Sequence, residues 1–163
     1  MSLNTRAVAD PALISRCAAR FGSQAVVVAI DARLAGVTED RPSGYEVVVR
    51  GGRDAVALDA VAWAVRAVAL GAGELLVTAI DRDGTGSGYD TELLRQITSV
   101  VRVPVIASGG AAGPADFVAA VRDGGADAVL AAGIFHRGEV SIAEVKRAMA
   151  AAGLPVRLTE ATA

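Results

Sequence analysis

The chain has 163 residues, a length typical of one domain, and carries a formal net charge of −2. That charge argues against a nucleic-acid-binding surface, and no apolar run reaches the roughly 18 residues that a membrane span needs. Hydrophobic residues make up 53% of the sequence and aromatic ones only 4%, so the core must consist of Ala, Val, Leu and Ile. Cys17 is the only cysteine and the first residues lack the apolar centre of a signal peptide, so we expect a cytoplasmic protein.

Short apolar runs alternate with helical patterns along the chain. The runs predict strands near residues 24–30, 74–80, 103–107 and 126–131. Helices are expected from Asp10-Pro11 to Gly22, over 57–70, 91–100 and 114–122, and from the capping box that begins at Ser141. Continuous apolar strands that alternate with helices are typical of a parallel sheet with right-handed crossovers. The predicted class is therefore α/β, with about four βα units.

A long polar stretch separates the first strand from the helix over 57–70. Residues 33–54 are expected to form a loop, in which Glu46–Arg50 is able to pair as a short hairpin strand. A loop of this length in a compact domain is typically a lid or disordered. The helix that follows should turn Leu58, Val61, Val65 and Val68 toward the core.

Four βα units are half of a TIM-type (βα)8 barrel, which has eight strands and about 250 residues. Four strands alone leave two parallel edges unpaired. We therefore expect residues 1–163 to form a single half-barrel domain that pairs with a second copy of itself or with an amino-terminal half-barrel. Residues 2–5 are expected to be the end of a strand that begins upstream.

The predicted strands are followed by residues suited to chemistry. Asp31 follows the first strand, Asp83-Gly84 lies in a glycine-rich loop after the second, and Ser108-Gly109-Gly110 and Ala132-Gly133 follow the last two. Barrels carry their active sites at the carboxyl ends of the strands, and the last two loops commonly hold a phosphate. Small residues let backbone N–H groups approach such an anion closely. No metal-ligand spacing and no dinucleotide fingerprint is present, so no cofactor is predicted.

Several motifs resemble the cyclase subunit of imidazole glycerol phosphate synthase. They are Asn4-Thr5, Phe21–Gln24, Val28–Ala32, Thr78–Asp90, Ile106–Gly110 and Ala131–His136. The resemblance covers essentially the whole chain and corresponds to the carboxyl-terminal half of that subunit. The motif around Asp83 is shared with the related histidine-pathway isomerase, whereas Phe21–Gln24 and Ala131–His136 favour the cyclase.

The resemblance implies an enzyme of histidine biosynthesis, a lyase in the cytoplasm. A glutaminase subunit supplies ammonia through the barrel. The cyclase combines that ammonia with phosphoribulosyl-formimino-aminoimidazole-carboxamide ribonucleotide. The products are imidazole glycerol phosphate and aminoimidazole carboxamide ribonucleotide.

The resemblance also implies roles for individual residues. Asp31 would be one of two acid–base aspartates, the other lying in the amino-terminal half. One phosphate of the substrate would be held by Asp83, Gly84, Ser108, Gly109, Gly110, Ala132 and Gly133, and the other by Asn4 and Thr5. Thr78 would line the cavity and Glu74 would belong to the ammonia gate at the opposite end. The chain departs from the family pattern at Gly133, where serine is common.

Two readings remain open besides a cyclase. The chain could be a non-catalytic half-barrel that binds sugar phosphates, or a relative of the isomerase. A second aspartate on the first strand of the complete barrel would distinguish the cyclase from the binding module, and that strand is not part of this sequence.

Overall fold

The computed structural model describes residues 1–158, so residues 159–163 of the predicted domain lie outside the described residues. The strands are β1 (Ser2–Leu3), β2 (Val27–Leu34), β3 (Tyr45–Val49), β4 (Asp54–Asp59), β5 (Glu74–Ala79), β6 (Val105–Ser108) and β7 (Ala128–Leu130). The helices are α1 (Thr5–Ala9), α2 (Ala12–Phe21), α3 (Ala60–Ala69), α4 (Thr91–Val100), α5 (Pro114–Arg122), α6 (Gly133–His136) and α7 (Ile142–Ala151), with a 3-10 turn at Ser23–Ala25.

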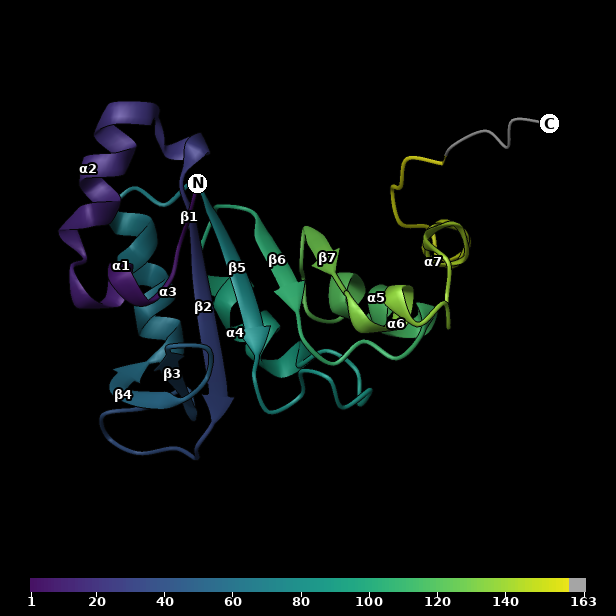
Figure 1. Cartoon of the computed structure of the whole chain (residues 1–163), viewed down its shortest axis with the longest axis horizontal. Coiled ribbons are helices and arrows are strands. Elements are labelled where there is room, and N and C mark those ends of the chain that lie inside the picture. The colour runs from purple at the N-terminus through teal and green to yellow at the C-terminus, as the bar shows by residue number, and fades with distance from the viewer. Residues whose placement is uncertain (159–163) are drawn as a thin grey trace.

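All seven strands belong to one sheet with the order β4-β3-β2-β5-β6-β7, and β1 pairs with the first half of β2. The pairs β1–β2, β2–β5, β5–β6 and β6–β7 are parallel, whereas β2–β3 and β3–β4 are antiparallel. The predicted α/β class with parallel βα units is confirmed, and the sheet is open rather than closed into a barrel (Figure 1).

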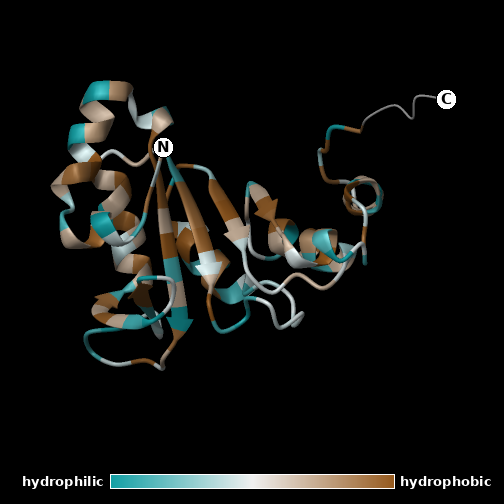
Figure 2. Cartoon of the chain, in the orientation of Figure 1, coloured by the Kyte–Doolittle hydropathy of each residue, from teal (hydrophilic) through white to brown (hydrophobic). Residues whose placement is uncertain are grey.

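The two faces of the sheet differ in what covers them. In β5, the side chains of Leu75, Val77 and Ala79 are buried, and they alternate with partly exposed residues. The buried face packs on α3, α4 and α5, where Trp63, Ile97 and Phe117 are almost inaccessible to solvent. In the part of the chain that the structure describes, no helix covers the other face, which is turned toward the viewer in Figure 1. Its central strands are largely apolar (Figure 2).

The predicted loop over 33–54 is confirmed over 35–44 and 50–53 but is interrupted by strands. Strand β2 continues to Leu34, and β3 and β4 form an antiparallel hairpin beside it. The suggested strand within Glu46–Arg50 is confirmed as β3. The alanines in residues 54–59 favour a helix. The segment is nevertheless a strand, because pairing with β3 satisfies its backbone groups.

Because β4 occupies residues 54–59, the helix predicted over 57–70 begins only at Ala60, after the cap Asp59. The predicted inward face is confirmed in part, since Leu58, Val61 and Val68 pack against the core as partly buried side chains. The buried side chains of α3 are Ala60, Trp63, Ala64 and Ala67, whereas Val65 is 45% exposed.

The other predicted boundaries shift by a few residues. The strands predicted over 24–30, 103–107 and 126–131 are observed at Val27–Leu34, Val105–Ser108 and Ala128–Leu130. Asp10 ends the unpredicted helix α1 instead of capping α2, and its carboxylate accepts a hydrogen bond from Arg16 Nη2 at 2.6 Å. The helices predicted to start at Thr91, Pro114 and after the Ser141 capping box are confirmed. None of the described helices is both long and apolar enough for a membrane span.

Candidate functional site

The uncovered face of the sheet carries polar residues in one register row at the carboxyl ends of its strands. Asp31 pairs with Thr78, Thr78 with Ser108, and Ser108 with Leu130. Residues in register on parallel strands point to the same face, and neighbouring strands lie about 4.8 Å apart. The backbones of Asp31 and Ser108 are therefore about 10 Å apart across β5.

A pocket of about 210 Å³ lies at the end of this row. It is lined by Asp83, Gly84, Gly86, Ser108, Gly109, Gly110, Ala111, Leu130, Ala131, Ala132, Gly133, Ile134 and Arg137. The structure thus brings together all seven residues that the family resemblance assigns to one phosphate.

Two glycines let the pocket loops meet backbone to backbone. Gly109 and Gly110 have φ angles of +90° and +104°. A Cβ at Gly109 would lie 2.7 Å from the carbonyl oxygen of Ala79, and one at Gly110 would collide with the carbonyl oxygen of Gly88. The N–H of Gly88 donates to the Gly110 oxygen at 2.8 Å, and this bond joins the loop after β5 to the loop after β6. Within residues 1–158, the amides of Gly109 and Gly110 donate no hydrogen bond, so they remain free for an anion.

Arg137 lines the pocket, and the sequence reasoning missed it. It follows the short helix α6, four residues after Gly133, and its guanidinium lies over that glycine. Its Nε and Nη2 donate to the carboxylate of Glu139 at 2.5 and 3.1 Å. The i, i+4 spacing from Gly133 on a helical turn places it beside that loop, although spacing alone does not show that it enters the pocket.

Asp31 is half-buried and accepts a hydrogen bond from Asn4 Nδ2 at 3.0 Å through its Oδ2. Asn4 therefore contacts the candidate acid–base carboxylate directly and lies outside the lining of the pocket. Thr5 also lies away from that pocket, because its hydroxyl accepts the N–H of Arg50 at the hairpin tip, at 3.0 Å.

Glu74 lies on the same face as Thr78, four residues earlier in β5. At about 3.3 Å per residue, this places it about 13 Å from Thr78 along the strand. It therefore marks the amino-terminal end of the sheet, opposite Asp31. The leucine between them, Leu76, pairs with Ala29 and Ile106 in an apolar middle row.

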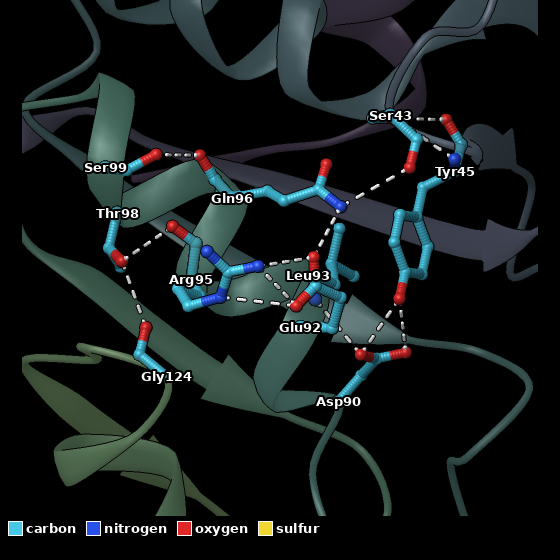
Figure 3. Close-up of polar contacts among 10 residues, drawn as sticks. All are labelled: Ser43, Tyr45, Asp90, Glu92, Leu93, Arg95, Gln96, Thr98, Ser99 and Gly124. Carbon is cyan, nitrogen blue, oxygen red and sulfur yellow. Dashed lines mark hydrogen bonds and ion pairs between the residues drawn. The ribbon is translucent and has the colours of Figure 1, made fainter. Parts of the chain in front are cut away.

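A buried carboxylate ties the hairpin to the loop that carries Asp83. The hydroxyl of Tyr45 on β3 donates to Asp90, with its oxygen 3.0 and 3.2 Å from Oδ1 and Oδ2 (Figure 3). Asp90 also caps α4 by accepting the N–H of Leu93 at 3.0 Å, and it lies 3.5 Å from Arg82 Nε. Burial, followed by the Asp90 charge, raises the pKa of the Tyr45 hydroxyl well above its ordinary value.

The described residues provide no set of side chains suited to bind a metal ion. No group of three His, Cys, Asp or Glu side chains within residues 1–158 is placed to hold a metal ion.

The family model described as "Histidine biosynthesis protein" matches residues 1–141. The chain is 55% identical over 157 residues to imidazole glycerol phosphate synthase subunit HisF of Hyphomonas neptunium, and 54% identical over 158 residues to that of Dehalococcoides mccartyi. These alignments cover 96% and 97% of this chain but 60% of each relative, so the chain spans about 60% of the length of the curated relatives it matches. The subunit of Leifsonia xyli subsp. xyli is 51% identical over 157 residues, 96% of this chain and 60% of its own. The family model matches residues 1–141, and the relatives are 50–55% identical HisF subunits. The chain therefore belongs to the histidine biosynthesis protein family and is similar there to the HisF subunits.

Proposed function

We propose that this chain is the carboxyl-terminal half of a cyclase of the imidazole glycerol phosphate synthase type. It acts in the cytoplasm on phosphoribulosyl-formimino-aminoimidazole-carboxamide ribonucleotide and ammonia. The products are imidazole glycerol phosphate and aminoimidazole carboxamide ribonucleotide. A glutaminase subunit supplies the ammonia at the end of the sheet that carries Glu74.

The observation that carries this proposal is the row of Asp31, Thr78 and Ser108, which connects a carboxylate to the glycine-lined pocket. Substrate binding and proton transfer then occupy separate places on one edge of the sheet. The pocket holds one phosphate through the backbone amides of Gly109 and Gly110. Asp31, about 10 Å away, stands over the part of the substrate that reacts.

Asp31 serves as a general acid or base. Proton transfer needs a carboxylate of fixed orientation within hydrogen-bond reach of the reacting atom. Asn4 supplies that orientation, because its amide holds Oδ2 and leaves Oδ1 for the substrate. The second acid–base aspartate belongs to an amino-terminal half-barrel. That half pairs with the unpaired edge strands of this chain, which is itself a single half-barrel domain. In the absence of that partner, a second copy of this chain covers the same edges.

The phosphate site is testable by substitution at Ala132. Substitution at Gly110 would not isolate the site, because any side chain there meets the Gly88 backbone. Ala132 is exposed and has a negative φ of −122°, so Ala132→Asp adds a charge at the rim without backbone strain. The nearly isosteric Ala132→Asn is its matched control. Phosphate titration followed by amide NMR shifts should move residues 108–110 and 132–133 in the wild type and in Ala132→Asn, and only weakly in Ala132→Asp. A wild-type titration that leaves these amides in place would refute the site.

The catalytic role is testable in a reconstituted barrel. The full chain is combined with the amino-terminal segment of a HisF relative and excess ammonium salt, and loss of the ribonucleotide substrate is followed. Asp31→Asn should lower kcat by about 10²- to 10⁴-fold with little change in KM, because the phosphate pocket is intact. The control Asp123→Asn alters an exposed carboxylate at the end of α5 and should keep full turnover. Normal turnover of the Asp31→Asn variant would refute the catalytic role of Asp31. The remaining function would then be that of a non-catalytic half-barrel that binds sugar phosphates.

A further inference from the structure

The pocket contains a charged group whose orientation suggests a role of its own. Of the residues that line it in the described structure, only Asp83 and Arg137 carry formal charge. A phosphate entering this pocket would meet the Asp83 carboxylate, so a nearby cation is needed to make the site favourable for an anion. Arg137 is the cation that the lining provides.

The contacts of Arg137 show which of its donors is free to serve. Glu139 engages Nε and Nη2 in a two-point contact, as arginine and carboxylate commonly do. This contact fixes the plane of the guanidinium. The remaining nitrogen, Nη1, lies against Gly133, where a Cβ would be only 2.7 Å away. Nη1 therefore lies on the pocket side, over the loop that carries Ala132 and Gly133.

Gly133 does not need to be glycine for backbone reasons. Its φ is not among the positive angles of the chain, so an L side chain is compatible with its conformation. The contact that a Cβ would meet at the closest distance is the Arg137 guanidinium. The arginine guanidinium thus occupies the space that a side chain at position 133 would need.

We propose that Arg137 binds the phosphate of the ligand through Nη1, and that Gly133 lacks a side chain in order to admit the guanidinium to the pocket. This proposal rests on the proposed phosphate site and adds to it one side chain that contacts the phosphate. The Glu139 carboxylate acts as a positioning group for the arginine. The expected ligand class is a phosphate monoester, whose oxygens accept from Nη1 and from the glycine amides together.

The test measures binding of inorganic phosphate and of a sugar phosphate, ribose 5-phosphate, to the full chain by amide NMR titration. Arg137→Gln should weaken binding about five-fold, a modest effect because the side chain is 61% exposed. Arg122→Gln is the matched control, since it removes another exposed arginine that pairs with a neighbouring carboxylate, and it should bind like the wild type. Unchanged affinity in Arg137→Gln would overturn the proposal.

The role of Gly133 is tested by Gly133→Ala, which displaces the guanidinium without adding a hydrogen-bonding group. It should weaken binding about as much as Arg137→Gln, and the double variant should be no weaker than either single variant, because both remove the same contact. Additive losses would overturn the link between the two residues. If the wild type shows no shifts at residues 108–110, the phosphate site itself fails. If the shifts are present and equal in Arg137→Gln, only the arginine proposal fails.

Discussion

The hydroxyl of Tyr45 is expected to stabilise the fold more than the otherwise similar hydroxyl of Tyr89. Both tyrosines are 4% exposed, and each donates one hydrogen bond to a group far away in the sequence. The acceptor of Tyr45 is the buried carboxylate of Asp90, whereas the acceptor of Tyr89 is the neutral carbonyl of Leu130 at 2.9 Å. Phenylalanine at either position removes one oxygen and retains the ring, so the pair isolates the effect of the charge on the acceptor.

The magnitude follows from the partners that remain. A hydrogen bond to a charged group contributes about 1.5–3 kcal/mol and a neutral one about 1 kcal/mol. Asp90 keeps the N–H of Leu93 and the nearby Arg82 after Tyr45→Phe, so the lower part of the range applies. We expect losses of about 1.5–2 kcal/mol for Tyr45→Phe and about 1 kcal/mol for Tyr89→Phe.

Urea unfolding followed by Trp63 fluorescence measures both losses, because Trp63 is the only tryptophan and is 1% exposed. With a slope of about 2 kcal/mol per molar, Tyr45→Phe should lower the midpoint by about 0.8–1 M at an unchanged slope. A loss no larger than that of Tyr89→Phe would refute the argument that the Asp90 charge strengthens this contact.

Two further predictions concern pH. Burial raises the pKa of Tyr45 and Tyr89 above 10.0, so the stability that their neutral forms provide is present below pH 10 and lost as pH rises through the folded-state values. The urea midpoint should therefore fall above pH 10, and less steeply in Tyr45→Phe. Burial opposes ionisation of Asp59, but hydrogen bonds from Ser43, Ala62 and Val61 outweigh it and lower the pKa below its ordinary value. Asp59→Ala should thus cost about 1–2 kcal/mol at pH 7, and the difference from wild type should shrink below about pH 4; a constant difference would contradict this.

The sequence was most informative where one local signal dominated. The glycine-rich loop after β5 and the Ser108–Gly110 loop were predicted as one site, because carboxyl ends of parallel strands necessarily meet at one edge. The barrel family was likewise predicted from motif order, and the family match confirms it. The Ser141 capping box predicted its helix start because both of its hydrogen bonds are local.

The errors arose where tertiary pairing decided between local alternatives. Residues 54–59 contain alanines and a leucine that also suit a helix, and only their pairing with β3 makes them a strand. The same pairing moved the start of α3 to Ala60. Arg137 was missed for a different reason, since its role depends on where Gly133 leaves space, and sequence spacing alone does not show that space.

The close approach of the loops at Gly110 divides the pocket into two walls with different freedom to vary. Gly109 and Gly110 accept no other residue without moving the backbone of a neighbouring loop. Gly84 has open space where its side chain would begin, but its φ of +75° favours glycine, whereas Ala132 already carries a side chain at a φ of −122°. A saturation library over these four positions should therefore recover folded variants mostly from Ala132. Changes in ligand preference, whether by selection or by design, have to enter through the loop that carries Ala132.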